Sequence, residues 1–180
     1  TMSMNLWHEV SCGKNAPDSV NVIIEIQKGS KNKYEIDKET GLIKLDRAMK
    51  TSQDYPFDYG FVPQSLWEDN DPLDIVLLTT SPLVPGILVE ARPIAVMRVM
   101  DCGEGDDKII AVPKSDPRFD EIEDLKDINK HTLKEIQHFF ETYKTIDDGK
   151  EVIVQGIEGK AAAVATVAKG LKMYQEKFGK

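Results

Sequence analysis

Acidic side chains are crowded into one short segment, Glu68-Asp-Asn-Asp-Pro-Leu-Asp74, where three aspartates fall within six residues. Carboxylates this close raise one another's pKa values unless a cation or several hydrogen bonds compensate, so a bound metal ion is the economical explanation. An EF-hand is a poor match, because Leu73 and Asp74 stand where that loop requires Asp or Asn and then Gly, and Pro72 intrudes. The segment therefore predicts a metal site of another kind, with an acidic solvated turn as the alternative.

A second acidic loop, Asp101-Cys-Gly-Glu-Gly-Asp-Asp-Lys108, separates two predicted strands and combines flexible glycines with carboxylates and a lysine. Taken alone, it is more simply interpreted as an ordinary polar hairpin loop. If both acidic loops lie at strand ends of one barrel and converge, their oxygens suffice for more than one Mg²⁺ ion. In that case, the two loops together would form a site for divalent cations.

Basic and aromatic residues form a third set of candidates. Lysine offers a point charge, arginine a planar fork and tyrosine a neutral donor, a combination that suits a substrate with several phosphate oxygens. Taken singly, Lys33 and Arg47 are more simply surface charges, and Tyr143 lies on an apolar helical face. The set consists of Lys33, two residues before Glu35 on one strand face, Arg47 after a strand, Tyr59, and Tyr143-Lys144.

The composition limits the partners that the protein can take. With 31 acidic against 23 basic residues, the 180-residue chain has a formal net charge of -8 and a pI near 5.0. This balance disfavours a nucleic-acid binder, because phosphate backbones are held mainly by clustered Lys and Arg. A highly charged phosphate substrate would need divalent cations between it and the carboxylates.

The chain length predicts one domain that covers residues 1–180, and the lack of a visible secretory signal predicts a cytoplasmic location. The most apolar run, Ala161 to Ala168, is too short for a membrane span, so no membrane contact is expected. No secretory signal is visible, and residues 1–3 ahead of Met4 are expected to be a remnant of expression. Cys12 and Cys102 are too few for a disulfide framework and are expected to be reduced thiols.

Residue types that favour strands dominate the first two-thirds of the chain, and from Thr132 the apolar spacing becomes helical. Short strands followed by amphipathic helices, without βαβ alternation, favour a β-barrel or a curved antiparallel sheet covered by helices. The expected strands are 20–26, a hairpin of 34–36 and 42–45, 75–79, 87–100 with a break near Pro93, 108–112 and 151–155, and the expected helices are 132–143 and 164–178.

Taken together, these segments resemble the family I inorganic pyrophosphatases, especially the short bacterial and archaeal members. Asp69-Asn-Asp-Pro-Leu-Asp-Ile75 is similar to that family's signature, and the likeness extends from about Leu6 to Phe178. The other matching segments are, in order, Glu25, Lys33-Tyr-Glu35-Ile-Asp-Lys, Asp46-Arg47, Tyr55-Pro56, Asp58-Tyr59-Gly60, Ala91-Arg-Pro-Ile94, Asp101, Asp106-Asp-Lys108, Ala111-Val-Pro113, and the stretch from His138 to Lys144.

The resemblance implies an OB-like five-stranded β-barrel covered by two or more helices, several Mg²⁺ ions in each active site, and a homohexamer. It also implies that Asp71 accepts a proton from water. The other implied site residues are the metal ligands Asp69, Asp74, Asp101 and Asp106, the carboxylates Glu25 and Glu35 that support the outer metal shell, and the substrate-binding residues Lys33, Arg47, Tyr59, Lys108, Tyr143 and Lys144.

Three positions depart from the family pattern. The family often has acidic residues directly after the position of Asp101 and directly before that of Asp106, whereas this chain has Cys102 and Gly105, with Glu104 displaced. Asn70 replaces the common glycine between two aspartates, and Asn adopts the left-handed turn conformation more readily than most residues. No loss of function is expected from Asn70.

The implied reaction is the hydrolysis of pyrophosphate to two orthophosphates. A water that bridges two Mg²⁺ ions would have a lowered pKa and an in-line approach to phosphorus, with Asp71 placed to take its proton. Two alternatives stay open. One is a metal-dependent hydrolase of other phosphoanhydrides, and the other is an OB-fold binding module without activity, against which the acidic balance argues.

Overall fold

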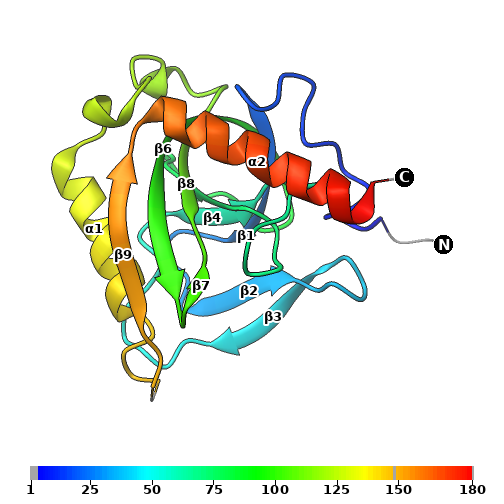
Figure 1. Ribbon diagram of the computed structural model, residues 1–180. Coiled ribbons are helices and arrows are strands. Elements are labelled where there is room, and N and C mark those ends of the chain that lie inside the picture. Colours follow the sequence, from blue (N-terminus) through cyan, green and yellow to red (C-terminus); the bar gives the residue numbers. More distant parts are fainter. Residues whose placement is uncertain (1–3, 148, 180) are drawn as a thin grey trace.

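Five strands of the computed structural model, which describes residues 4–147 and 149–179, close into a ring (Figure 1). Hydrogen-bonded pairing runs in the order β1 (Val20–Ile26), β4 (Asp58–Phe61), β5 (Asp74–Leu77), β8 (Lys108–Pro113) and β6 (Leu88–Asp101), and β6 pairs back onto β1. The pairings are antiparallel except for β5 with β8, which is parallel. This closed ring confirms the expected OB-like barrel.

β6 is long enough to serve two parts of the sheet. Its first half pairs with β1, and its second half pairs with β7 (Glu104–Gly105) and β9 (Val152–Glu158). The expected break near Pro93 is wrong, because β6 continues through it. The ladder with β8 instead shifts register between Pro93 and Ala95, which fits a residue without an N–H group.

The predicted hairpin is β2 (Asn32–Ile36) paired with β3 (Ile43–Ala48), and it lies at one end of the barrel (Figure 1). Arg47 was expected after a strand, but it lies within β3, opposite Lys33. The buried carboxylate of Glu25 in β1 accepts a hydrogen bond from the Ile36 N–H at 2.7 Å, which fastens the hairpin to the barrel.

β4 was missed by the sequence prediction because Asp58-Tyr-Gly-Phe61 has neither alternation nor β-branched residues, and all four residues are buried. Gly60 lies opposite Ile24, and a Cβ at this position would overlap the carbonyl oxygen of Ile23. Glycine therefore allows β1 and β4 to approach closely.

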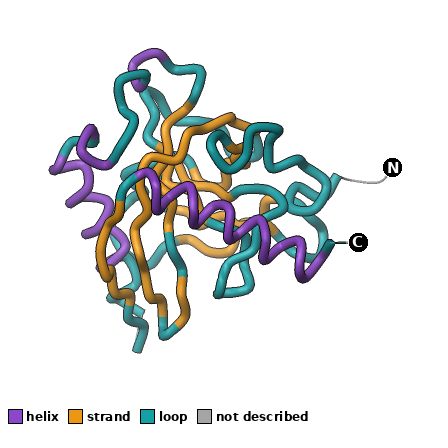
Figure 2. The backbone as a smooth tube through the Cα atoms, turned by 45° about the horizontal axis from the view of Figure 1, so that its top comes forward, coloured by secondary structure: helices purple, strands orange, loops and turns teal. Residues whose placement is uncertain are grey.

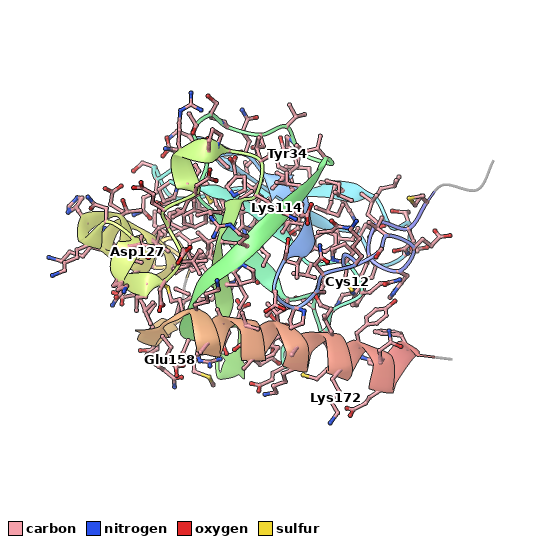
Figure 3. The ribbon with its side chains drawn as sticks, turned by 90° about the horizontal axis from the view of Figure 1, so that it is seen from above. Cys12, Tyr34, Lys114, Asp127, Glu158 and Lys172 are labelled. Carbon is pink, nitrogen blue, oxygen red and sulfur yellow. The ribbon has the colours of Figure 1, made fainter. Side chains whose placement is uncertain are left out.

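Two α-helices of the described chain cover the barrel on different sides, as Figures 1 and 2 show. Helix α1 (Lys130–Thr142) is capped by Asn129 and buries Phe139 and Phe140 against Tyr55 and Phe57. Helix α2 (Lys160–Phe178) packs along β6 and carries Lys172 on its outer side (Figure 3). Both expected helices are confirmed, although they begin two and four residues earlier than predicted.

Two short 3-10 helices, η1 (Pro117–Phe119) and η2 (Leu125–Asp127), lead from β8 to α1. Within residues 4–147 and 149–179, no helix combines the length and apolar character that crossing a membrane would require.

Candidate active site

A cavity of about 290 Å³ lies where the two acidic loops meet the β2–β3 hairpin and the end of α1. The structure brings all but one of the predicted site residues to its lining. The exception is Arg47, which forms an ion pair with Asp46 at 3.0 Å. The predicted residues around the cavity are Glu25, Lys33, Glu35, Tyr59, Asp69, Asp71, Asp74, Asp101, Asp106, Lys108, Tyr143 and Lys144.

Three carboxylates in this cavity meet closely enough to share a cation. One oxygen from each of Asp69, Asp74 and Asp106 lies within 4.8 Å of the other two. Asp74 is the first residue of β5, and Asp106 lies two residues before β8, which pairs with β5 in parallel and places Lys108 beside Asp74. The parallel pairing of β5 with β8 therefore makes the two acidic loops converge.

Crowding and burial disfavour negative charge in this cluster. Burial raises the pKa of Asp74 to about 7, with a further contribution from the nearby charge of Asp106 and opposition from Lys108. Burial, followed by the charge of Asp74, raises the pKa of Asp69 to about 6. A set of oxygen donors with excess negative charge fits a hard divalent cation such as Mg²⁺, which would relieve the repulsion.

Lys108 is the cation that this chain itself supplies to the cluster. Its side chain is 4% exposed, and its Nζ lies 2.7 Å from Asp74, 2.8 Å from Asp106 and 2.5 Å from the hydroxyl of Tyr59. Although burial opposes it, Asp106 and Asp74 hold the pKa of Lys108 well above its usual value. Lys108 therefore stays charged and holds the two carboxylates in place.

Asp101 lines the same cavity, but it does not belong to the cluster formed by Asp69, Asp74 and Asp106. Its carboxylate accepts a hydrogen bond from Lys144, which follows α1 in the chain. Burial opposes it, but the Lys144 ammonium lowers the pKa of Asp101. Asp101 is therefore ionised and available as a further oxygen ligand.

Asp71 is the most accessible aspartate of the first acidic loop. Its side chain is 52% exposed and forms an ion pair with Lys38 at 2.8 Å. Asn70, beside it, has a positive φ of 66°, as expected for the left-handed turn position. The Asp71 carboxylate is thus accessible to solvent at the cavity.

Glu25 and Glu35, the two carboxylates implied to support an outer metal shell, differ in their surroundings. Glu25 is buried, and burial together with the charge of Asp74 raises its pKa well above the usual value. Lys33 lies 3.8 Å from Glu35 and 3.5 Å from Asp46, so β2 and β3 bring basic and acidic groups to the same side of the cavity.

The departures from the family pattern are placed in the same region. Cys102 and Glu104 line the cavity, and a Cβ at Gly105 would overlap the carboxylate of Glu68. Glu68 thus brings a carboxylate to the space that a larger residue at position 105 would occupy.

Sequence reasoning assigned no role to two residues beside the site. Tyr55 lines the cavity, and it was matched as part of the segment Tyr55-Pro56 without an implied role. Lys38, the last residue of the matched segment Lys33-Tyr-Glu35-Ile-Asp-Lys, contacts Asp71 from the β2–β3 turn, and the resemblance implied no role for it.

Comparisons with known proteins point to one family. A family model described as inorganic pyrophosphatase matches residues 22–175. The chain is 47% identical to an inorganic pyrophosphatase of Haloferax volcanii over 97% of this chain and 99% of that protein. It is 46% identical to soluble inorganic pyrophosphatase 1 of Arabidopsis thaliana, covering 94% and 80%. The crystal structure of inorganic pyrophosphatase from Thermus thermophilus superposes with a TM-score of 0.92 at 44% identity, over 96% of this chain and 99% of that one.

Proposed function

This chain belongs to the inorganic pyrophosphatase family and hydrolyses pyrophosphate to two phosphates, and we propose that it does so with several Mg²⁺ ions held by four aspartates. The observation that carries this proposal is the convergence of Asp69, Asp74 and Asp106 within 4.8 Å in one cavity. Asp101, which lines the same cavity, completes the proposed ligand set.

When bound, Mg²⁺ neutralises phosphate oxygens and makes an attacking water more acidic. Asp71 takes the proton of that water, because its exposed carboxylate lies at the cavity without belonging to the close cluster. As the water oxygen bonds to phosphorus, the bond to the bridging oxygen breaks and its electron pair leaves with the second phosphate.

Basic and hydroxyl groups of the chain hold the two phosphates. Lys33, Lys144 and Tyr143 reach the cavity from β2 and from the end of α1, and they supply positive charge and a neutral donor. From the barrel side, Tyr59 adds a hydroxyl donor and Lys108 adds positive charge. Arg47 completes the set if its guanidinium turns from Asp46 toward the substrate.

Glu25 and Glu35 would support water around the metal ions from the β1 and β2 side of the cavity. We further propose that residues 1–180 form one pyrophosphatase domain, which the family match over 22–175 supports. The domain would act in the cytoplasm as a homohexamer and would not bind nucleic acid or a membrane surface. The net charge of -8 supports the absence of nucleic-acid binding.

One assay tests the activity against its alternatives. Phosphate release from pyrophosphate with Mg²⁺ is expected to exceed release from ATP by orders of magnitude. Comparable release from ATP would favour a hydrolase of other phosphoanhydrides. No release from either substrate, together with oligonucleotide binding at low salt, would favour a binding module.

A further inference from the structure

Asp107 and Arg98 form a partly buried pair directly behind Asp106. The Asp107 side chain is 13% exposed, and its Oδ2 accepts a hydrogen bond from Arg98 Nη1 at 3.0 Å. Its other oxygen, Oδ1, accepts a hydrogen bond from the backbone N–H of Val99, also at 3.0 Å. Both carboxylate oxygens of Asp107 are therefore committed to β6, with one charged partner and one backbone partner.

These contacts fill an interruption in the sheet. The β6–β8 pairing ends at Met97 with Lys108, and the β6–β7 pairing resumes at Met100 with Gly105. Between them, the N–H of Asp106 donates to the Val99 carbonyl at 2.9 Å, but the Val99 N–H donates to the Asp107 carboxylate. The Asp107 carboxylate thus accepts a hydrogen bond that a backbone carbonyl would accept in a continuous ladder.

The contacts of Asp107 determine which side of the chain the Asp106 carboxylate faces. Successive residues of an extended chain point to opposite sides, and among the described cavity-lining residues Asp106 is present whereas Asp107 is not. Fixing the Asp107 carboxylate on the outer side therefore fixes the Asp106 carboxylate on the cavity side. A rotation of the chain at Asp107 would move Asp106 away from Asp74.

Arg98 connects this point to two further elements. Its Nη1 also contacts Thr166 Oγ1 of α2 at 2.9 Å, and its Nε donates to Glu158 at the end of β9. Figure 3 shows Glu158 beside the N-terminal end of α2. The guanidinium is therefore held by β9 and α2, and through Asp107 it transmits their positions to the loop that carries Asp106.

We propose that Asp107 and Arg98 are positioning residues that set the metal affinity of the site by fixing Asp106. This inference rests on the proposed function in one respect, namely that Asp106 is a metal ligand. Neither Asp107 nor Arg98 is among the described residues that line the cavity. They act on the site through the Asp106 backbone, in the same way that outer-shell groups of other metal sites orient the metal ligands.

The test measures Mg²⁺ affinity of the substrate-free protein by calorimetry, together with the Mg²⁺ dependence of turnover. Asp107→Asn can still accept from the Val99 N–H but loses the charge that pairs with Arg98, whereas Asp107→Ala loses both contacts. We expect Asp107→Ala to weaken Mg²⁺ binding by roughly 10- to 100-fold, with a smaller loss for Asp107→Asn. Turnover at saturating Mg²⁺ should stay within about threefold of the wild type, because the reacting groups are unchanged.

The matched control is Asp116→Asn. Asp116 also accepts a backbone N–H bond, from Arg118 at 3.0 Å, and pairs with the same arginine at 3.3 Å, but it lies away from the cavity. The Asp116→Asn substitution should lower the melting temperature of the protein without changing its Mg²⁺ affinity. If the Asp107 variants also lower the melting temperature without changing Mg²⁺ affinity, the role of Asp107 is only structural and the inference is wrong.

Arg98→Gln keeps the test decisive if Asp107→Ala does not fold. The proposal predicts that Arg98→Gln and Asp107→Asn each weaken Mg²⁺ binding and that the double variant is no weaker than the worse single one. Unchanged Mg²⁺ affinity in both folded single variants, or fully additive losses, would overturn it. A wild type that binds Mg²⁺ but does not hydrolyse pyrophosphate would contradict the proposed function and leave this binding test intact.

Discussion

The two acidic loops that meet at the cavity are held in place by different kinds of contact. Asp74, at the end of the Glu68–Asp74 loop, pairs with buried Lys108, but the rest of this loop is held from outside by lysines: Lys38 contacts Asp71 at 2.8 Å, and Lys169 contacts Glu68 at 2.9 Å. Both lysine side chains are more than half exposed. Water and salt screen such pairs, which contribute only about 0–1 kcal/mol each.

The Asp101–Lys108 loop is fastened from within. Lys108 and Lys144 are largely buried where they pair with its carboxylates, and Arg98 is partly buried against Asp107. Breaking a buried pair leaves an uncompensated charge and costs several kcal/mol, so these contacts hold one geometry. The difference indicates a division of labour. The buried side fixes the proposed metal ligands, while the exposed tip leaves the Asp71 carboxylate accessible to solvent.

The largest expected effect comes from the exposed side. Asp71→Asn keeps the shape of the side chain but cannot accept a proton, so the rate of the chemical step should fall by roughly 10² to 10⁴. Mg²⁺ affinity and thermal stability should change little, because Asp71 is half-exposed and outside the close cluster. The measurement is turnover at saturating pyrophosphate over a range of Mg²⁺ concentrations, beside calorimetry with Mg²⁺ alone. If excess Mg²⁺ fully restored the turnover of Asp71→Asn, the result would instead indicate that Asp71 is a metal ligand.

Metal binding should stabilise the whole barrel. A ligand that binds only the folded state adds about 2.7 kcal/mol at one hundred times its Kd. For a chain of this size, roughly 2–4 °C in Tm corresponds to each kcal/mol, so saturating Mg²⁺ should raise Tm by about 5–11 °C. Thermal melts with Mg²⁺ and with a chelator measure the difference. An unchanged Tm would argue against a divalent-ion site among these carboxylates.

On the buried side, Asp74→Asn removes charge from a proposed ligand. Its defect should appear first as an Mg²⁺ requirement raised by at least about tenfold, which excess metal partly rescues. Lys108 keeps Asp106 as a charged partner, so the variant should still fold. Turnover and Tm measured against Mg²⁺ concentration, with Asp71→Asn in parallel, check the assignment. If high Mg²⁺ rescues Asp71→Asn and not Asp74→Asn, the two roles are reversed.

Much of the fold follows from local sequence patterns. β-Branched runs such as Val20–Ile26 and the turn at Asp37–Gly41 predicted a strand and a hairpin that the structure contains. β4 escaped prediction because Asp58 stands in a fully buried strand. Its carboxylate is satisfied by partners that are distant in the sequence, namely the N–H of Lys28 at 2.8 Å, the Thr79 hydroxyl at 2.5 Å and the N–H of Leu83 at 3.3 Å.

The site was predictable in its residues but not in its contacts. Crowded aspartates indicated a metal site, yet their convergence depends on the parallel pairing of β5 with β8, which no local pattern reveals. The pairing of Asp107 with Arg98 bridges a gap in the ladder that exists only in the folded sheet. Lys38 belongs to a segment that the resemblance matched, but its contact with Asp71 exists only once the hairpin folds against the Asp71 loop.

The smallest expected effect concerns that lysine. Lys38 Nζ contacts both Asp71 and, at 3.1 Å, the backbone carbonyl of Asn70, so it steadies the loop tip from the hairpin. Lys38→Met keeps most of the apolar stem and removes the charge. Because the pair is exposed, the loss of stability should be below about 1 kcal/mol, and turnover should fall by no more than about fivefold.

Lys169→Met is the matched control, since Lys169 makes a similarly exposed pair with Glu68 on the same loop but does not touch Asp71. Equal Tm changes with a lower turnover only in Lys38→Met would show that Lys38 acts through Asp71. Raising the salt concentration should narrow the difference between wild type and Lys38→Met, because screening weakens the exposed pair in the wild type. A stability loss of several kcal/mol in Lys38→Met would contradict the contrast itself, since the outer loop would then be held as firmly as the buried one.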